Sequence, residues 1–151
     1  MSGAVFLDFR KAFDMVRHDI LLKKLSSYYL SIASITFTQS YLQGRLQCVI
    51  VNGTYSQETS IKSGVPQGSM LGPLLFCIFI NDVHMRLTRP SVQCDLFSAD
   101  VTLNTANDNI GNTRRDLQQS LNDITGWCCR NLMALNPTKT KCMLMATRHK
   151  H

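Results

Sequence analysis

Two short apolar runs, residues 92–97 (VQCDLF) and 101–106 (VTLNTA), are separated by only three residues, Ser-Ala-Asp. A connection this short cannot join parallel strands, which need a crossover of about a dozen residues or more. The spacing therefore predicts an antiparallel hairpin with Asp100 as the acid at its tip. This feature constrains the fold most, because it requires an antiparallel sheet and places a carboxylate at the end of two strands.

Other segments supply further strands and helices. Residues 4–8 (AVFLD) predict a buried strand that ends in Asp8. A second hairpin is predicted around Asn52-Gly53, since Asn-Gly is the strongest short signal for a type I′ turn. The segment KTKCMLMAT predicts a last strand. Helices are expected at residues 19–42 (one helix, or two joined near Ser31), just after Pro73, and at residues 112–135.

The helix expected at residues 112–135 is amphipathic, which predicts that it covers one face of a sheet. Its apolar stripe consists of Leu117, Leu121, Ile124, Cys128, Leu132 and Leu135. The predicted element order, β–α–ββ–α–ββ–α–β, favours an α+β fold with helices packed on one face of a mostly antiparallel sheet. A chain of 151 residues is expected to form one domain with a genuine core.

Composition limits the class of protein and its partners. The formal net charge is +6, which fits a solvated basic surface and a polyanion partner about equally well. The six cysteines have no metal-binding spacing, and most lie in apolar runs, which favours reduced core thiols. We find no membrane-length apolar run and no signal-peptide pattern. We therefore expect an intracellular protein, in the nucleus or cytoplasm, that is not secreted and has no membrane partner.

Asp8 and Asp100 are the candidate catalytic acids, because each ends a strand or sits at a hairpin tip. They are far apart in sequence but would meet if their strands are neighbours. Facing carboxylates can bridge two Mg²⁺ ions about 3.5–4 Å apart, as phosphoryl transfer requires. From spacing alone, the simpler interpretation that both acids only cap turns is favoured.

Four segments outweigh that simpler interpretation, because they occur together in one order and at compatible spacings. They are FLDFRKAFDMVRHDILLKKL, GVPQGSMLGPLLFCIFINDV, LFSADVTL and WCCRNLMALNPTKTKCMLM. Together, from Val5 to about Met145, they resemble the palm of a reverse transcriptase (RNA-directed DNA polymerase) of the non-LTR, jockey-like LINE retrotransposons. The resemblance implies a right-hand polymerase palm and, as partners, an RNA template, a DNA primer and deoxynucleoside triphosphates. It implies Mg²⁺ as the cofactor, with Mn²⁺ as the alternative.

The first block of the resemblance implies that Asp8 is a ligand of both metal ions. The backbone carbonyl of Phe9 would be a further ligand and would border the nucleotide. Phe13 falls where the family keeps an aromatic ring under the sugar of the incoming nucleotide, and this ring would exclude a 2′-hydroxyl. An ordinary core position is the equal alternative for Phe13.

The second and fourth blocks imply further contacts. Gln67 and Gly68 would border the nucleotide and the template base, while the helix at 74–80 would be buried and purely structural. Lys139 matches a lysine that acts as a general acid for the departing pyrophosphate, and a solvent-facing lysine is the simple alternative. Trp127 and Asn136 also match the fourth block, and we expect them to serve packing and a turn.

The third block departs from the family pattern F/Y-A-D-D. Aligned without gaps, Ala99 replaces the first acid and Asp100 is the second, so Asp8 loses its main metal-binding partner. A gapped alignment instead keeps Ala99-Asp100 as the A-D pair and puts Val101 at the second acid, and activity would only be reduced. In both alignments one carboxylate is missing, and impaired catalysis is expected.

The resemblance leads us to expect that residues 1–151 form a partial reverse transcriptase domain, the palm, with the family's fingers and thumb absent. The leading function is RNA-directed DNA polymerisation, impaired in this copy. A non-catalytic nucleic-acid-binding remnant, supported by the +6 charge, is one alternative. A decayed relic with no selected function is the other.

Overall fold

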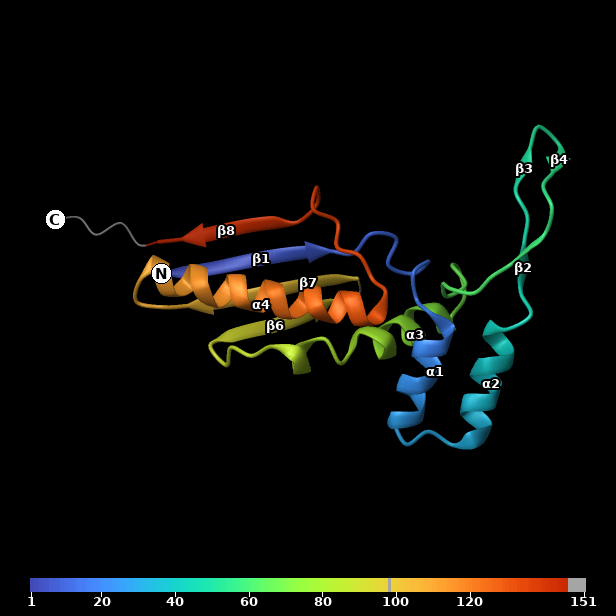
Figure 1. The fold of residues 1–151 in the computed structure, drawn as a ribbon, viewed down its shortest axis with the longest axis horizontal. Coiled ribbons are helices and arrows are strands. Elements are labelled where there is room, and N and C mark those ends of the chain that lie inside the picture. The colour runs from blue at the N-terminus through green and yellow to red at the C-terminus, as the bar shows by residue number, and fades with distance from the viewer. Residues whose placement is uncertain (98, 147–151) are drawn as a thin grey trace. The chain divides into compact units, whose positions relative to one another are not determined.

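The computed structural model describes residues 1–97 and 99–146, which divide into two compact units (Figure 1). The sheet unit combines Met1–Ala12 with the chain from Ile80 onward. The inserted unit is Phe13–Phe79. Each unit contains its own elements and its own cavities, and each is described by itself below.

The sheet unit is built on four antiparallel strands, in the order β6-β7-β1-β8 (Figure 1). Their bounds are Ser2–Asp8 for β1, Val92–Phe97 for β6, Asp100–Ala106 for β7 and Lys141–Met145 for β8. Strands β6 and β7 form the predicted hairpin, with Phe97 paired to Asp100. Strand β1 lies beside β7, which confirms that the strands carrying Asp8 and Asp100 are neighbours.

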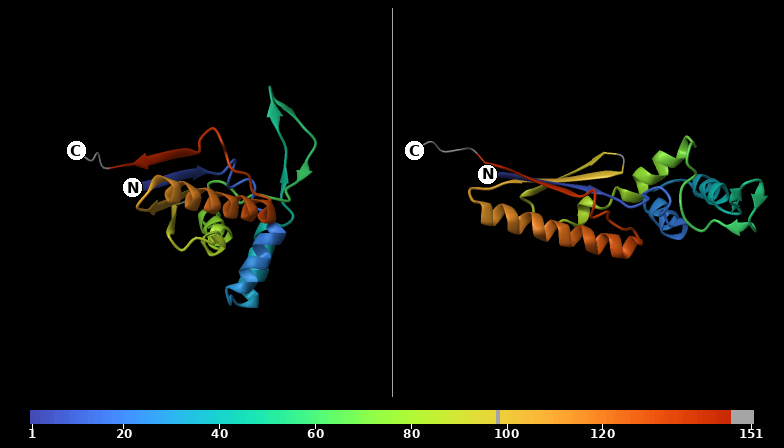
Figure 2. Two further views of the ribbon diagram at one scale, coloured as in Figure 1. Left: turned by 60° about the vertical axis from the view of Figure 1, so that its left-hand side comes forward. Right: turned by 90° about the horizontal axis from the view of Figure 1, so that it is seen from above.

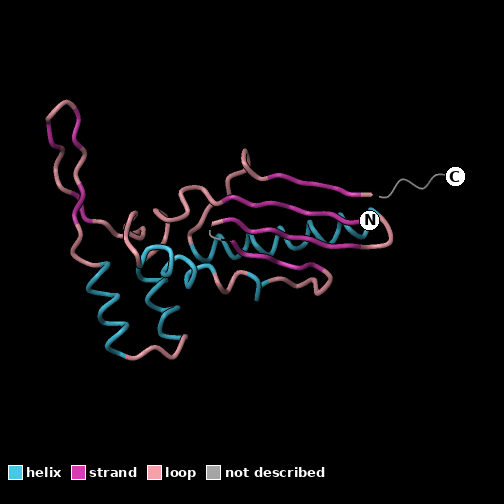
Figure 3. Tube along the Cα trace, turned by 180° about the vertical axis from the view of Figure 1, so that it is seen from behind, coloured by secondary structure: helices cyan, strands magenta, loops and turns pink. Residues whose placement is uncertain are grey.

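One face of this sheet is covered by α4 (Ile110–Asn131), which contacts β1, β6 and β7. The helix runs along the sheet in the right-hand view of Figure 2. Alternate strand residues on this face, among them Leu7 and Val101, are fully buried, whereas Phe6 and Thr102 on the other face are not. The view from behind in Figure 3 shows that other face, with the strands in front of the helix.

The helix approaches β1 most closely at Gly3. A Cβ at this position would lie 2.7 Å from Cγ2 of Thr113 and 2.9 Å from Cδ1 of Leu117. Such contacts are too short for real carbon atoms, so a side chain here would have to displace those of Thr113 and Leu117, and glycine permits the close α4–β1 packing. The predicted apolar stripe is confirmed at Leu117, Ile124 and Cys128, which are all buried.

The prediction that α4 continues to residue 135 is wrong. The helix ends at Asn131, and Leu132 is the C-cap with φ 55°, in the left-handed region. Leu132 is half exposed as a result, and Met133 is the buried residue that follows. Leu135 lies beyond the helix, in an isolated bridge with Phe9. The apolar period alone does not reveal this left-handed turn.

The inserted unit begins with two helices, α1 (His18–Ser27) and α2 (Ile32–Leu42). This confirms the interpretation of two helices joined near Ser31, whose hydroxyl accepts a hydrogen bond from the backbone N–H of Ser34. Four two-residue strands follow, and β2 pairs with β5 while β3 pairs with β4. Their bounds are Leu46–Gln47, Ile50–Val51, Thr54–Tyr55 and Thr59–Ser60 for β2 to β5.

The turn predicted at Asn52-Gly53 is confirmed. It joins Val51 to Thr54, which are paired in β3 and β4. Asn52 and Gly53 have φ values of 50° and 80°, and a type I′ turn requires positive φ at both central positions.

Helix α3 (Leu71–Ile80) corrects two predictions. It begins before Pro73, which a helix tolerates in its first turn because the N–H groups there lack intrahelical partners. It is also not buried throughout, since Leu74 is 55% exposed and Cys77 is exposed, while Phe76 and Phe79 are buried. The apolar run therefore forms one buried face and one exposed face.

The prediction of core thiols is also wrong for most of the cysteines. Cys128 is buried and Cys94 is half-buried, but the other four are exposed: Cys48, Cys77, Cys129 and Cys142. Cys142 is exposed because β8 is the edge strand of the sheet, a position that composition does not reveal.

A short 3₁₀ helix, η1 (His84–Arg86), follows α3. Within residues 1–97 and 99–146, no helix combines the length and apolar character needed to cross a bilayer.

Candidate functional site

The two predicted catalytic acids lie directly opposite each other at the end of the sheet. Asp8 is the last residue of β1 and Asp100 the first of β7, and they are cross-strand partners in the antiparallel register. Residues so paired point to the same face, with Cβ atoms about 4.5–5.5 Å apart. The strand register thus brings together two carboxylates that are distant in sequence.

A cavity of about 450 Å³ opens beside these carboxylates. It is lined by Phe6, Leu7, Asp8, Phe97, Asp100, Thr102 and Lys139. All three residues predicted to be catalytic, Asp8, Asp100 and Lys139, therefore line one cavity of the sheet unit. Their catalytic roles stay a prediction.

Lys139 forms an ion pair with Asp8, with 3.8 Å between Nζ and Oδ2. The lysine side chain is 69% exposed and the aspartate 27% exposed. An exposed pair at this distance contributes little stability, since water screens it. The ion pair is important instead for position, because it holds the Lys139 ammonium group at the edge of the cavity beside the carboxylates.

Asn136, which was expected to serve only a turn, also contacts Asp8. Its Nδ2 donates to Oδ2 of Asp8 at 3.1 Å, and its backbone N–H donates to the Asp8 carbonyl at 2.8 Å. The Thr138 hydroxyl donates to Oδ1 of Asn136 at 2.7 Å, which fixes the orientation of the amide. Asn136 therefore positions Asp8 through both its side chain and its backbone.

A compact turn carries Asn136 and Lys139 together. The carbonyl of Asn136 accepts from the backbone N–H groups of Lys139 at 3.2 Å and Thr140 at 3.0 Å. The sequence signal for this turn is Asn-Pro-Thr, since asparagine before proline favours turn initiation. The turn expected at Asn136 from the fourth block is confirmed, whereas the side-chain contact with Asp8 was not predicted.

Phe9 and Trp127 support the end of β1 from within the core. Both are buried, with ring centroids 6.1 Å apart, and the Trp127 indole N–H donates to Asp82 at 2.9 Å. The packing role expected of Trp127 is confirmed. The hydrogen bonds beside Phe9 use the carbonyls of Asp8 and Ala134, and the Phe9 carbonyl takes part in neither.

The hairpin tip holds Ala99, the position at which the resemblance predicts a lost acid. Ser98 lies outside the described residues, whereas Ala99 is half-buried in the turn and immediately precedes Asp100. No cluster of three or more His, Cys, Asp or Glu side chains suited to a metal ion occurs in the described part of the chain. The donors present are two carboxylates and nearby backbone carbonyls. Such a set fits Mg²⁺, which commonly takes one or two carboxylates and completes its shell with water and substrate phosphates.

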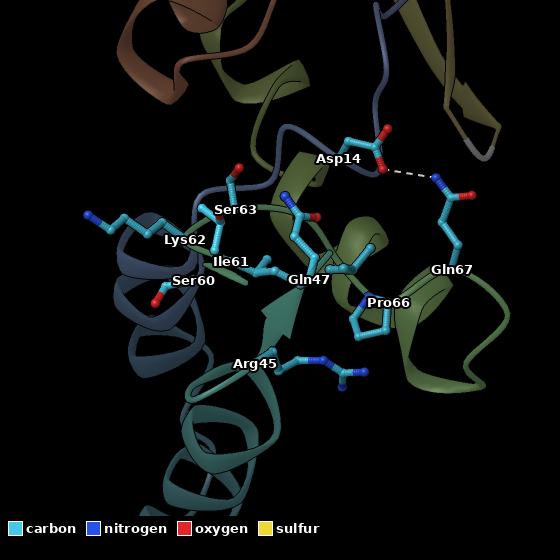
Figure 4. Close-up of a pocket in the computed structure, with 12 residues that line it drawn as sticks. Asp14, Arg45, Gln47, Ser60, Ile61, Lys62, Ser63, Pro66 and Gln67 are labelled. Atoms are coloured by element: carbon cyan, nitrogen blue, oxygen red, sulfur yellow. Dashed lines mark hydrogen bonds between the residues drawn. The ribbon is translucent and has the colours of Figure 1, made fainter. Parts of the chain in front are cut away.

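The other predicted nucleotide-binding residues lie in the inserted unit and share a cavity of about 480 Å³ there. Phe13, Gln67 and Gly68 all line it. The half-buried Phe13 ring packs against Phe76, with centroids 4.8 Å apart, so it is partly a core residue and partly a cavity wall. Figure 4 shows the Gln67 amide donating to Asp14 at 2.9 Å, a contact that the sequence did not reveal.

The loop that carries Gln67 is held by backbone hydrogen bonds to the segment before α1. Gly64 N–H donates to the Val16 carbonyl at 2.7 Å, and Val65 N–H donates to the Phe13 carbonyl at 2.8 Å. Gly64 has φ +94°, and a Cβ there would lie 3.1 Å from the Asp14 backbone. Glycine at this position therefore permits the close approach of the two segments.

Comparisons with known proteins agree with this arrangement. A family model described as reverse transcriptase (RNA-dependent DNA polymerase) matches residues 2–150. The chain is 34% identical over 144 residues to a probable RNA-directed DNA polymerase from transposon BS of Drosophila melanogaster, covering 91% of this chain and 16% of that protein. It is 32% identical over 143 residues to the RNA-directed DNA polymerase from mobile element jockey of Drosophila funebris, with the same two coverages of 91% and 16%.

Solved structures share the fold at low identity. Apo telomerase from Candida tropicalis, truncated from its C-terminal domain, superposes with a TM-score of 0.69 at 15% identity, covering 94% of this chain and 30% of that chain. Telomerase from Candida albicans, in complex with a TWJ fragment of telomeric RNA, gives 0.69 at 16% identity, covering 98% and 27%. The predicted α+β class with an antiparallel sheet is confirmed.

Proposed function

The chain belongs to the reverse transcriptase (RNA-dependent DNA polymerase) family, and we propose that residues 1–151 are the palm of an RNA-directed DNA polymerase from a non-LTR retrotransposon. The observation that carries this proposal is the pairing of Asp8 with Asp100 at the end of two neighbouring strands, with Lys139 in the same cavity. A phosphoryl-transfer site needs such carboxylates on a rigid element.

In this proposal Asp8 and Asp100 hold Mg²⁺, with Mn²⁺ as the alternative. The bound metal supplies two effects: it lowers the pKa of the primer hydroxyl and neutralises charge that develops on the phosphate. Asn136 holds Asp8 in place through its amide. Lys139, whose ammonium lies 3.8 Å from Asp8, is the proton donor to the departing pyrophosphate.

Ala99 impairs this site. A methyl group cannot bind a metal ion, and in the ungapped alignment it replaces the acid that acts together with Asp8. In the gapped alignment the pair of Asp8 and Asp100 is complete, and Val101 replaces the second acid instead. Val101 is buried and points away from the Asp8 face, because its cross-strand partner is Leu7.

The partners follow from the proposed activity. They are an RNA template, a DNA primer and deoxynucleoside triphosphates, with Phe13, Gln67 and Gly68 bordering the nucleotide. We place the reaction inside the cell, in the nucleus or cytoplasm, where these substrates occur. The chain spans 16% of the length of the curated relatives named above, so the complete polymerase is the right context for a test.

Primer extension on an RNA template with Mg²⁺ tests the proposal in a complete jockey-type polymerase that carries residues 1–151 in place of its own segment. We expect weak extension from the native sequence and at least about a hundredfold more from Ala99→Asp, since removal of a main catalytic group costs about that much or more. Val101→Asp is the matched control for the gapped alignment and should bring no gain. Equal and robust extension by the native and Ala99→Asp chains would contradict the claim of impairment.

A non-catalytic binding function is the second candidate, and a second cavity of the inserted unit, a groove of about 750 Å³ lined by residues that include Arg45 and Lys62, favours it. Salt-dependent binding of a primer–template, without extension by either the native or the Ala99→Asp chain, would favour this function over polymerisation.

A further inference from the structure

Helix α2 and the residues that follow it have an unusual surface. From Tyr28 to Gln57, Arg45 is the only charged residue. Along α2 only Leu42 is buried, while Phe37 is 59% exposed. Exposed aromatic side chains on a helix without charge make this surface a candidate for contact with a ligand or partner that accepts aromatic contacts.

Three side chains on this surface form a stacked column, which we call the aromatic column: Phe37, Tyr41 and Arg45. They are spaced four residues apart, so they follow one another along the helix and just beyond its end. The Phe37 and Tyr41 rings are nearly parallel, at 17°, with centroids 6.5 Å apart. The Arg45 guanidinium carbon lies 5.6 Å from the Tyr41 centroid. The two rings and the guanidinium group are therefore stacked in the order of the chain, and the positive charge lies at one end of the column.

The column ends at a polar groove of about 750 Å³, shown in Figure 4. Arg45 is part of the groove wall, together with Lys62. The two basic residues lie on adjacent segments, because Ile61 N–H donates to the Arg45 carbonyl at 3.0 Å. Within the described residues neither Arg45 nor Lys62 forms an ion pair with a carboxylate, so both charges are available to an anion.

The rest of the groove wall is suited to a ligand that carries hydroxyl groups. Gln47, Thr59, Ser60 and Ser63 contribute amides and hydroxyls that can donate and accept hydrogen bonds. Asp14 is the one carboxylate in the wall, and it already accepts the Gln67 amide. In Figure 4 both Arg45 and Lys62 lie apart from this occupied acid, and their side chains extend in opposite directions.

We propose that the aromatic column and this groove form a binding surface for single-stranded RNA. A base stacks on the exposed Phe37 ring, which Tyr41 supports from behind. Backbone phosphates contact Arg45 and Lys62, and the hydroxyl-rich wall receives the 2′-hydroxyls. Aromatic faces combined with a basic groove are the usual means of binding single strands without sequence preference. The proposal rests on the proposed polymerase function only for the identity of the strand as template, since binding itself requires neither metal nor nucleotide.

Fluorescence anisotropy of the 151-residue chain with a labelled 15-nucleotide oligouridine tests this surface, in EDTA and without nucleotides. Arg45→Gln is compared with Lys23→Gln, which removes one charge from an exposed residue of α1 in the same unit. We expect Arg45→Gln to weaken binding by about fivefold or more and Lys23→Gln to have little effect. The double variant Arg45→Gln/Lys62→Gln should lower the slope of log affinity against log salt by about 1.4, or about 0.7 per lost phosphate contact.

A second pair of variants tests base stacking on the aromatic column. Phe37→Ala should weaken binding by about fivefold or more, because each lost base–aromatic stack has at least that effect. Tyr41→Phe should bind as the native chain does, since the Tyr41 hydroxyl has no hydrogen-bond partner among the described residues. Circular dichroism confirms that each variant is folded before it is compared.

Three results would overturn the proposal: equal affinity of the Arg45→Gln and Lys23→Gln chains, preference for duplex RNA, or concentration-dependent self-association that Phe37→Ala abolishes. Equal binding of oligouridine and oligodeoxythymidine would exclude a role for the 2′-hydroxyls. These results are independent of catalysis. Asp8→Asn should leave oligouridine binding unchanged, so loss of extension and loss of binding are separable.

Discussion

Two regions are held in place by different kinds of interaction: the acid site of the sheet unit, formed by Asp8 and Asp100, and the proposed RNA-binding surface of the inserted unit, formed by the aromatic column and its groove. Asp8 depends on strand register and on Asn136, which lies more than a hundred positions along the chain. Arg45 and Phe37 depend on helical spacing and on short turns within one segment. A site fixed by register can keep its backbone frame when one carboxylate is lost, as we propose for Ala99. A site fixed by local turns depends more on its backbone, so the two regions should respond differently to substitution.

Thiol labelling should show the largest contrast between the units. Burial, and to a smaller extent the neighbouring Cys129, raises the pKa of the Cys128 thiol in the sheet unit to about 12. Its thiolate fraction at pH 8 is then roughly a thousandfold below that of an ordinary thiol. Cys48 of the inserted unit is exposed and should label rapidly with iodoacetamide. Peptide mass spectrometry over time measures both rates, and comparable rates would contradict the packing described for α4.

Gly64→Ala should be the most destabilising single change in the inserted unit. The substitution meets both an unfavourable φ of +94° and a Cβ contact of 3.1 Å to the Asp14 backbone, and we expect a loss of about 2–3 kcal/mol. Gly44→Ala is the matched control, since φ is +69° and nothing lies within 4 Å of its Cβ, so its cost is about 1 kcal/mol. Urea unfolding measures the difference, and equal losses would show that the loop does not require this close approach.

Asn136→Ala should have a smaller effect on stability and a distinct effect on the acid site. The lost hydrogen bond to the partly exposed Asp8 carboxylate corresponds to about 1 kcal/mol of unfolding free energy. Lys139→Ala removes only the exposed ion pair and should cost less than about 0.5 kcal/mol. In the Ala99→Asp polymerase, Asn136→Ala should lower kcat more than it raises KM for the nucleotide. A pure stability loss with unchanged kcat would remove Asn136 from the site.

The pH dependence of stability should give the smallest effect. The Ser91 hydroxyl donates to Asp116 at 2.8 Å and, with Asn107 and Arg89, lowers the pKa of this carboxyl. A lowered folded-state pKa contributes stability that is present above the unfolded value of about 3.9 and is lost as pH falls through the folded value. The urea midpoint of Asp116→Asn should therefore fall less steeply below about pH 4 than that of the native chain.

Asp108→Asn is the control for that measurement, since Asp108 is exposed and has no hydrogen-bond partner within the described residues. It should leave the acid dependence unchanged. Identical acid profiles for the native and Asp116→Asn chains would show that the Ser91 contact does not stabilise the folded state.

Local sequence signals predicted much of the fold. The hairpin of β6 and β7, the Asn52-Gly53 turn and the break near Ser31 each follow from a few adjacent residues, and all three are present. The sequence set the neighbouring positions of β1 and β7 only as the condition under which Asp8 and Asp100 would meet, and the strand register fulfils it. What failed needed tertiary information: the end of α4 at Leu132, the exposed half of α3, and the exposed cysteines of edge or surface elements.

The candidate site, like the fold, was predictable from the sequence only in part. The sequence indicated Asp8, Asp100 and Lys139, and the structure places their side chains around one cavity. It did not indicate that Asn136 contacts Asp8 or that Gln67 contacts Asp14, because each contact depends on where a distant loop comes to lie. The aromatic column was missed because a four-residue spacing of Phe37, Tyr41 and Arg45 is equally typical of an ordinary helix face.

Mn²⁺ binding, followed by electron paramagnetic resonance, tests most directly whether Asp8 and Asp100 form a metal site from which Ala99 removed one ligand. The native chain should bind Mn²⁺ weakly, Ala99→Asp at least about tenfold more tightly, and Ala99→Asp/Asp8→Asn no better than the native chain, since carboxylates are the preferred ligands of this ion. Equal affinity of the native and Ala99→Asp chains would contradict the assignment of this strand end as the metal site.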